Sequence, residues 1–418
     1  MLKKMIAIIF IFIVATVAWT ILGATIMSRT YDSSFISSSK VESTWGTQHD
    51  QQPPTAFFKT QVPKKVETTE NGKKVVQTVK EEVVTSLPLD ATRIDVKLDL
   101  GHRQKGLLWY STYKVDFMGH YAFKNPSDKE QWVQFDLKFP TTQAIYDNLT
   151  FAVDGNPAAI TALENAASSV VKVGGGQAAL LTVGYSSQGL NQWRYSFGHG
   201  DVSQVRDFTL NMTTNFKDID FPDNTLSPSE KTQTGNGWNL RWTYKNLLSG
   251  YQIAMVMPEK LQPGPLAGRI SFFAPVSLFF FFFLMLIITT MRGIDLHPMN
   301  YFFLAAAFFS FHLLLAYLVD HISIHASFAI AAAVSIFLVV SYLRLVVGIR
   351  FASREAALAQ FIYLVMFSYA FFLKGFTGLA ITIGSVLTLF VVMQITGRIR
   401  WAERFTVKPA AEPASELS

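Results

Sequence analysis

The chain of 418 residues contains no cysteine and is poor in charged residues. The missing thiols exclude disulfide frameworks, thiolate zinc sites, iron–sulfur centres and cysteine nucleophiles. Only 16% of the residues are charged, against about a quarter in soluble domains. The mean hydropathy of +0.26 agrees with this deficit. The low charge content indicates a membrane protein. The lack of cysteine suits an exported bacterial domain that folds without disulfide bridges.

The sequence also lacks recognisable catalytic motifs. The glycines at 174–176 are followed by Gln177 and not by a Lys-Ser/Thr pair, which excludes a phosphate-binding P-loop. No G-x-S-x-G or H-E-x-x-H pattern occurs. His199 and Asp201 stand among glycines in Tyr195–Asp201, which favours a loop over a site. We therefore expect no catalytic, cofactor-binding or metal-ligating residues, no cofactor, and a protein that is not an enzyme.

Six apolar stretches are long enough to cross a bilayer, which takes about 20 helical residues. The first, Met5–Met27, follows Lys3 and Lys4 and is longer than the roughly 7–15 apolar residues of a cleaved signal peptide. Because Leu22–Ala24 is also a poor cleavage site, an uncleaved signal anchor is favoured over the alternative of a cleaved signal. The other stretches cover Ile270–Thr290, Met299–Val319, Ala326–Leu343, Ala356–Leu373 and Phe376–Ile395.

The distribution of charge predicts the orientation, because Lys and Arg in short loops favour the cytoplasmic side. With the N-terminus inside, the cytoplasmic pieces hold five acidic and ten basic side chains, namely Lys3, Lys4, Arg292, Arg344, Arg350, Arg354, Arg398, Arg400, Arg404 and Lys408. The opposite loops, 320–325 and 374–375, hold only Lys374 as a permanent cation. Both termini are therefore expected in the cytoplasm. The net charge of +6 follows from topology and requires no nucleic-acid partner.

The segment 28–269 predicts a β domain. Arg93–Leu100 and Gln131–Phe139 alternate polar and apolar residues, the period of a half-buried strand, and Tyr110–Phe123 is rich in aromatic and β-branched residues. Asn71–Gly72 and Asp154–Gly155 are strong hairpin turn signals. Many short strands with such turns indicate a sandwich or an antiparallel sheet stack.

The two ends of this domain carry further expectations. Ser28–Phe57, rich in Ser, Gln and Pro, predicts a partly extended lead-in after the anchor. Trp238–Tyr244 and Tyr251–Met257 predict the last strand pair. The glycines at 174–176 predict a turn between the strands on either side of them.

Polar residues in the bundle are the best candidates for a functional group. His312 lies inside the third span, and Asp320, His321 and His325 lie at its outer end. An intramembrane ionisable residue suggests function by default. His321 and His325 have the i,i+4 spacing of a helical metal site, but the turn expected at 322–324 removes that meaning. Helix capping and one inter-helix hydrogen bond are the favoured interpretation over a proton or metal role.

The stretch MRGIDLHPMNYFF, 291–303, predicts a tight corner between the second and third spans. Gly293 suits the end of a helix, and Pro298 suits the first turn of the next, which places His297 at a cap-like position. Arg344, Arg350 and Arg354 also suit positive-inside anchoring, which we favour over the alternative of acidic lipid head groups or a partner.

Leu296–His321, LHPMNYFFLAAAFFSFHLLLAYLVDH, resembles the CreD-type inner-membrane proteins, also called the colicin-tolerance or cell-envelope-integrity family. In that family a Leu/Ile-His-Pro-x-Gln-Tyr start leads into a span that ends in Ser-Glu-His. Here Asn300 replaces the Gln and Asp320 replaces the Glu. Thr44–Gly46, Leu226–Glu230 and Ile399–Trp401 resemble other parts of the family.

This resemblance implies an N-terminal anchor, a large periplasmic β-rich domain, a C-terminal helical bundle and a link to envelope stress. It supplies no catalytic residues. The family often has a Glu before the His-Pro and a Glu-Asp-Tyr segment before the last span, and both are missing here. No role tied to those acids is carried over.

We therefore predict an α+β membrane protein of the bacterial inner membrane, with a sandwich-like all-β periplasmic domain. The expected parts are an anchor at 1–27, the β domain at 28–269, a five-helix transmembrane domain at 270–401 and a disordered cytoplasmic tail at 402–418. The expected function is non-enzymatic, in cell-envelope integrity or stress response. Besides the lipid bilayer, a protein partner or envelope component is expected. The alternative is a transport or channel component that uses His312, Asp320 and His321.

Overall fold

The computed structural model describes residues 2–70, 73–106, 108–163, 165–198 and 203–397. The chain divides into two compact units. The helical unit comprises Met1–Ser34, Gly106–Leu108 and Leu261–Ser418, and the β unit comprises Phe35–Lys105 and Trp109–Lys260. This composition matches the predicted α+β class.

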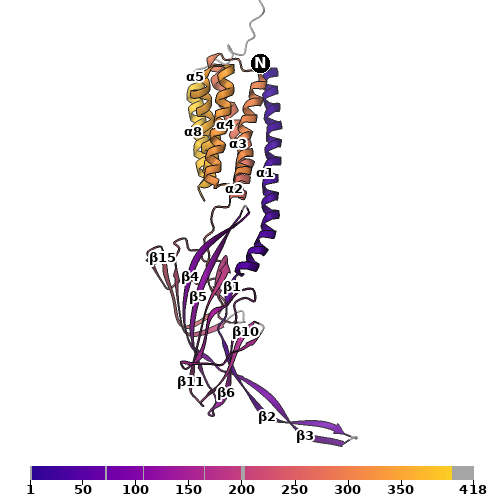
Figure 1. Ribbon diagram of the computed structural model, residues 1–418, viewed down its shortest axis with the longest axis vertical. Helices are drawn as coiled ribbons and strands as arrows, with labels where there is room; N and C mark the ends of the chain where they lie inside the picture. The colour runs from indigo at the N-terminus through magenta and orange to yellow at the C-terminus, as the bar shows by residue number, and fades with distance from the viewer. Residues whose placement is uncertain (1, 71–72, 107, 164, 199–202, 398–418) are drawn as a thin grey trace, which may run out of the picture. The chain divides into compact units, whose positions relative to one another are not determined.

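One helix, α1 (Leu2–Trp45), contributes to both units (Figure 1). Its Lys3–Tyr31 part is apolar and long enough to span a membrane. The prediction of an extended lead-in is wrong for residues 28–45, which continue the helix. That segment contains neither Gly nor Pro, and hydroxyl groups such as that of Thr44 bond back to the carbonyl one turn earlier, so nothing in the sequence breaks the helix before Gly46.

Gly46 ends α1 for a steric reason. Its φ of 105° belongs to the left-handed region, and a Cβ there would lie 2.5 Å from the carbonyl oxygen of Gln188. Only glycine allows this conformation together with so close an approach of two backbone segments.

The largest sheet of the β unit has eight strands in the order β14-β15-β13-β4-β5-β11-β7-β8. Their bounds are β4 Leu89–Lys105, β5 Leu108–Lys124, β7 Asp147–Val153, β8 Asn156–Pro157, β11 Ala178–Leu190, β13 Ser203–Thr214, β14 Glu230–Thr234 and β15 Gly237–Ser249. The pair β13–β4 is parallel. The sheet is therefore mixed and not purely antiparallel.

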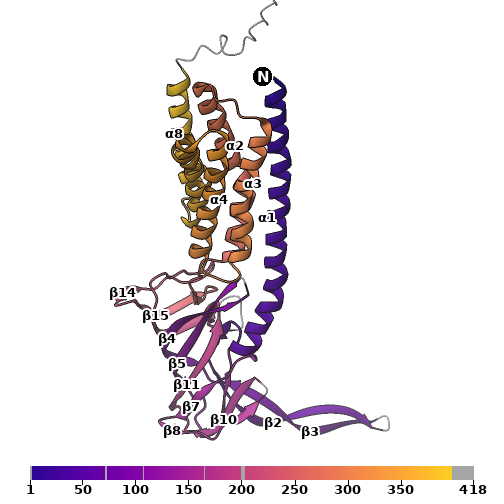
Figure 2. The same ribbon diagram turned by 45° about the horizontal axis from the view of Figure 1, so that its top comes forward.

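A second sheet has five strands in the order β3-β2-β6-β10-β9, and a third has three in the order β1-β12-β16. Their bounds are β1 His49–Gln51, β2 Thr55–Glu70, β3 Lys73–Ser86, β6 Gln131–Lys138, β9 Thr161–Leu163, β10 Ala166–Val173, β12 Gln192–Tyr195 and β16 Ile253–Val256. Strands β2 and β3 pair along their whole length, but only Thr55–Phe58 of β2 also pairs with β6. The remainder is a two-stranded arm (Figures 1 and 2).

Strand assignments from alternation are confirmed. In β4, Ile94, Val96 and Leu98 are buried while the residues between them are exposed. The Asp154–Gly155 turn joins the paired strands β7 and β8, and both residues have positive φ, as a primed hairpin turn requires. Asn71–Gly72 lies outside the described residues, although β2 and β3 on either side of it pair as a hairpin.

One expectation about pairing is corrected, and one about a turn is confirmed. The strands β15 and β16 are not partners, because β15 pairs with β13 and β14 whereas β16 pairs with β12. The glycines at 174–176 do form a turn, but β10 before it and β11 after it belong to different sheets. The sequence therefore located these strands correctly, but strands that follow one another in the chain are not hydrogen-bonded partners here.

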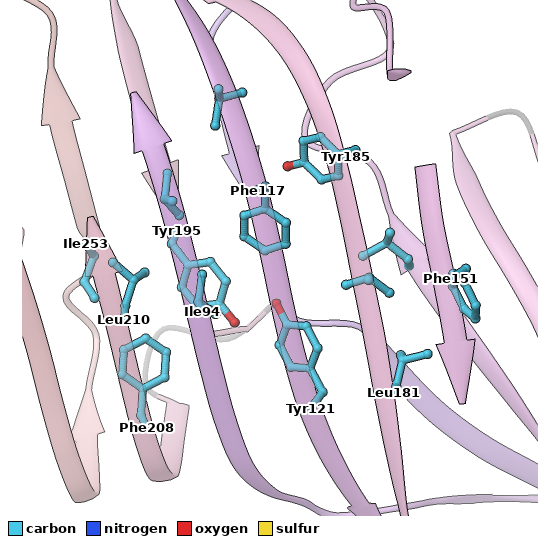
Figure 3. Packing of buried hydrophobic residues seen from close by; sticks show 14 of the residues in the cluster. Ile94, Phe117, Tyr121, Phe151, Leu181, Tyr185, Tyr195, Phe208, Leu210 and Ile253 are labelled. Carbon is cyan, nitrogen blue, oxygen red and sulfur yellow. The ribbon is translucent and has the colours of Figure 1, made fainter. Parts of the chain in front are cut away.

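The core of the β unit is one continuous cluster of buried side chains that come from all three sheets. Figure 3 shows Tyr121, Tyr195 and Phe208 among its rings. Phe123 of β5 and Phe135 of β6 meet edge to face at 5.8 Å, so the large sheet and the five-stranded sheet pack directly on each other. This is the sandwich-like packing that the sequence predicts.

The helical unit consists of the first part of α1 and five further apolar spans (Figure 2). The elements are α2 Pro263–Arg292, α3 Pro298–Leu318, α4 Ile324–Val346, α5 Ile349–Phe351, η1 Ala352–Ala356, α6 Ala357–Gln360, η2 Phe361–Met366, α7 Phe367–Tyr369, η3 Ala370–Phe372 and α8 Thr377–Thr396. Elements α5 to η3 together form one span, in which η1 and η2 are π-helical. Six candidate spans within the described part of the chain match the predicted number.

The predicted corner between the second and third spans is confirmed. Gly293 caps α2 with a φ of 66°, and its N–H donates to the carbonyl oxygen of Thr290. Pro298 is the first residue of α3, and Nδ1 of His297 accepts from the backbone N–H of Met299 at 3.2 Å. His297 is thus an N-cap, as its position predicts.

Candidate functional site

Two ion pairs join α1 to the loops of the bundle. Near the start of the helix, the Lys4 ammonium pairs with Asp295 in the loop between α2 and α3. Near residue 30, Nη2 of Arg29 lies 2.7 Å from Oδ2 of Asp320 in the turn after α3. The two cations are 25 positions apart, which is about 37 Å along a helix, a little more than the hydrocarbon thickness. These charges therefore tie α1 to the bundle near both ends of the span.

Between the two pairs, His312 is fully buried against α1. Its ring meets Trp19 of α1 edge to face at 5.7 Å and Phe311 at 4.9 Å. Neither ring nitrogen of His312 has a hydrogen-bond partner among the described residues, and neither does Nε1 of Trp19. The inter-helix hydrogen bond expected for His312 is therefore not found, and aromatic packing takes its place.

The polar residues predicted beside His312 do not join it. Asp320 pairs with Arg29, His321 lies in the turn, and His325 at the start of α4 lies 5.1 Å from the Phe372 ring. Within the part of the chain that the structure describes, no hydrogen bond or ion pair links His312 to Asp320 or His321. His321 lies in the turn and His325 in α4, so their i,i+4 spacing does not place them on one helix face.

Sequence inspection missed a second polar group, which lies between α3, α4 and the fifth span. Nε2 of Gln360 donates to Oγ of Ser335 at 2.7 Å, and that hydroxyl donates to the carbonyl oxygen of Ala307 at 2.6 Å. Nearby, the Tyr363 hydroxyl donates to Thr388 at 2.9 Å. Inter-helix hydrogen bonds of this kind hold apolar helices in register. The signal available in the sequence was the pair of polar side chains, Gln360 and Tyr363, within an otherwise apolar span.

The most connected polar group of the β unit surrounds His49. Its Nδ1 lies 2.8 Å from the Tyr113 hydroxyl and its Nε2 lies 3.1 Å from Oγ of Ser187. Tyr113 donates to the carbonyl oxygen of Gln192, and Ser187 donates to that of Ile145. Burial lowers the pKa of His49 to about 4. Because the group is enclosed and both hydroxyls also donate to carbonyl oxygens, it fastens β1 to β5 and β11.

An exposed surface of the five-stranded sheet is the clearest candidate for binding. We call it the Trp132 face; it consists of Trp132, Gln134 and Asp136 on β6 and Val170 and Lys172 on β10, with the buried Ser168 at its edge opposite Asp136. Val133, Phe135 and Leu137 occupy the buried side of β6. Trp132 is 61% exposed and Val170 is 53% exposed. A large apolar side chain on the solvent side of a strand does not serve the core.

The polar groups of the Trp132 face are held in place. Asp136 accepts from Oγ of Ser168 at 2.6 Å and from Nε2 of Gln134 at 3.0 Å. The Lys172 ammonium lies 5.0 Å from the centre of the Trp132 ring. The alternation of QWVQFDLKF places Trp132 on the polar side of the strand, so the sequence contained the signal for this surface.

No group of three or more His, Cys, Asp or Glu side chains that could hold a metal occurs in the ranges that the structure describes. His199 and Asp201 lie outside those ranges. The β unit therefore presents an exposed surface, the Trp132 face. In the helical unit, two ion pairs join α1 to the bundle, and His312 is buried between them.

Comparison with known proteins gives one family match. The family model described as inner membrane protein CreD matches residues 201–402. No curated protein matches the chain.

Solved structures give only weak similarities. A candidate nutrient-binding protein of Legionella pneumophila is 10% identical with a TM-score of 0.29, over 47% of this chain and 74% of that one. An M1 zinc metallopeptidase mutant of Deinococcus radiodurans with bound substrate is 10% identical with a TM-score of 0.27, over 78% of this chain and 96% of that one. In another structure of that enzyme the match has a TM-score of 0.22 and covers 42% of the enzyme chain. These scores are too low to support an argument about fold or function.

Proposed function

Since the chain is a CreD-family inner-membrane protein, we propose that it maintains the cell envelope as a non-enzymatic, multi-pass protein. Its β unit binds a protein partner or a component of the envelope. The proposed orientation has both termini in the cytoplasm and the β unit in the periplasm, as the excess of Lys and Arg in the inner loops favours.

The Trp132 face is the observation that carries this proposal. Exposed tryptophans dominate the energy of many interfaces because they bury a large area with few rotatable bonds. Here Trp132 is paired across the strands with Lys172, Val170 is paired with Gln134, and Asp136 is paired with Ser168, all on the same face of the sheet. Such a surface offers an apolar anchor together with polar groups that fix the orientation of a ligand.

The proposal also rests on what the described polar groups do. The His49 group is engaged in holding strands together, and the ion pairs of α1 join helix to loop. A binding role requires only the exposed Trp132 face and no catalytic contribution from these groups.

A complementation experiment tests this function. Host cells that lack the gene are challenged with detergent and β-lactam and supplied with the wild-type chain, with Trp132→Ala, or with Leu248→Ala. Leu248 is a matched control, because it is also an exposed apolar strand residue of the β unit but lies on β15. We expect the wild type and Leu248→Ala to restore resistance and Trp132→Ala to fail at equal membrane abundance. The proposal would be overturned if cells lacking the gene showed no envelope defect, or if Trp132→Ala restored resistance fully.

A further inference from the structure

A cleft of about 570 Å³ opens in the helical unit between the first turns of α1, the end of α2 and the end of α8. Its walls are formed mainly by Ile8, Phe283, Ile287 and Val392, and Lys4 and Asp295 lie at its edge. In Figure 2 the corresponding ends of these helices lie near the chain's N-terminus.

The interior of the cleft offers water no free hydroxyl donor. The hydroxyl of Thr289 donates to the carbonyl oxygen of Met285, that of Thr290 to Leu286, and that of Thr396 to Val392, all at 2.7–2.8 Å. The hydrogen of every hydroxyl in the lining is therefore taken up by a carbonyl oxygen of its own helix. A largely apolar cleft of this size in a membrane bundle suits a hydrocarbon chain, whereas water would find few hydrogen-bond partners among Ile8, Phe283, Ile287 and Val392.

The edge of the cleft carries both signs of charge. The Lys4 ammonium has three donors, and its pairing with Asp295 leaves others available to a phosphate. The Asp295 side chain is 93% exposed, so its carboxylate can accept from a second cation. The hydrogen bond from Lys4 lowers the pKa of Asp295, which keeps the carboxylate ionised. The C-terminal end of α2 beside it also favours positive charge.

We propose that this cleft binds one phospholipid with a primary-ammonium head group. One acyl chain lies between α1, α2 and α8, the phosphate contacts Lys4, and the head-group ammonium contacts Asp295. Phosphatidylglycerol would bring the same phosphate to Lys4 but a neutral glycerol in place of the ammonium. Asp295 and the α2 terminus would then gain no cationic partner, which disfavours that lipid.

A second groove of the same unit provides an internal comparison. It has a volume of about 900 Å³ and lies between the fifth span and α8, with Leu358, Phe361, Leu387 and Val391 in its lining. None of its lining residues is charged. It can accept a hydrocarbon chain, but it has no charged side chain that would distinguish one lipid head group from another.

Native mass spectrometry of the full-length protein, released from vesicles that contain equal amounts of phosphatidylethanolamine, phosphatidylglycerol and phosphatidylcholine, tests the proposal. We expect the wild type to retain one phosphatidylethanolamine in preference to the other lipids. Asp295→Asn should reduce that preference about fivefold, the usual size of one exposed charge contact. Because Asp295 is on an exposed loop, this variant keeps the fold.

Two filling variants separate the cleft from the groove. Thr290→Phe places a ring in the cleft and should lower lipid retention, whereas Leu387→Phe fills only the groove and should leave the head-group preference unchanged. Retention in proportion to the mixture, a preference for phosphatidylglycerol, or a phosphatidylethanolamine preference that Asp295→Asn leaves unchanged would each overturn the proposal.

Discussion

The guanidinium of Arg29 lies 2.7 Å from the carboxylate of Asp320, and it also faces the Tyr317 ring at 5.3 Å. This contact ties α1 to the turn between α3 and α4 across 291 residues of sequence. Asp320 is the residue that replaces the family's Glu, so the acid at this position has a structural partner here.

A charge swap measures what this pair contributes. Arg29→Asp and Asp320→Arg should each lower the stability of the purified protein by about 1 kcal/mol, because both side chains are partly exposed. The double swap should recover about half of the summed loss, which thermal unfolding in detergent would show. The same cycle at Lys64 and Glu81, a more exposed pair in the arm, should show no coupling. Equal coupling at both sites would mean that Arg29 and Asp320 do not hold α1.

The cysteine-free chain permits a direct test of orientation. Thr234→Cys places a thiol on β14, and Ser353→Cys places one on the segment after α4. Both positions are exposed. A membrane-impermeant maleimide applied to cells with a permeabilised outer membrane should label the first variant and not the second. Labelling of Ser353→Cys in intact inner membranes would reverse the proposed topology.

His49 makes the β unit sensitive to acid. In the folded chain its pKa is about 4, against 6.5 when exposed, because burial disfavours the charged ring. Between these values the unfolded chain binds a proton that the folded chain does not, so stability is lost as the pH falls from 6.5 to 4. The full effect is about 3 kcal/mol. Above pH 6.5 the ring is neutral in both states and contributes no pH dependence.

Comparison with His49→Gln isolates this contribution. Chemical unfolding at pH 7.5 and pH 5 should give a larger drop in stability for the wild type than for the variant. The variant itself is expected to be less stable at both pH values, since it disturbs Tyr113 and Ser187, so the informative quantity is the difference between the two pH values. Identical differences in both proteins would rule out a titrating, buried His49.

Gly189 is expected to tolerate no side chain. A Cβ there would lie 2.4 Å from the Tyr113 ring and 2.5 Å from Nδ1 of His49, and both rings are buried. Gly189→Ala should therefore cost at least about 3 kcal/mol, the upper end of ordinary overpacking. Gly378→Ala is the control, because nothing lies within 4 Å of its Cβ position and it is helical. That change should leave stability unchanged or raise it by about 1 kcal/mol.

His312 distinguishes the proposed function from transport. Its ring nitrogens lack partners among the described residues and its surroundings are aromatic, so His312→Leu should alter stability by no more than about 1 kcal/mol. If the protein has no proton or ion pathway, the combined variant His312→Leu, Asp320→Asn should still restore envelope resistance. Normal insertion with the phenotype of a gene deletion would instead favour the transport alternative.

Features that depend on local pattern were predictable from the sequence. Six spans followed from the length and apolar character of single segments, strand positions from alternation within β4 and β6, and the corner at Gly293 and Pro298 from the backbone properties of those residues. Each rests on interactions within about ten residues, which a short stretch determines by itself.

The tertiary structure decided which elements are partners. Strand β16 pairs with β12 and not with the adjacent β15, and β10 and β11 separate into different sheets, because the best cross-strand packing is between residues far apart in the chain. The same holds for the sites. The partners of His49 come from β5 and β11, the partner of Asp320 comes from α1, and the apolar cleft is assembled from three helices. Only the packing of segments distant in the chain brings these groups within contact distance. The sequence therefore determined the helices, strands and turns, and the tertiary structure determined which of them contact one another.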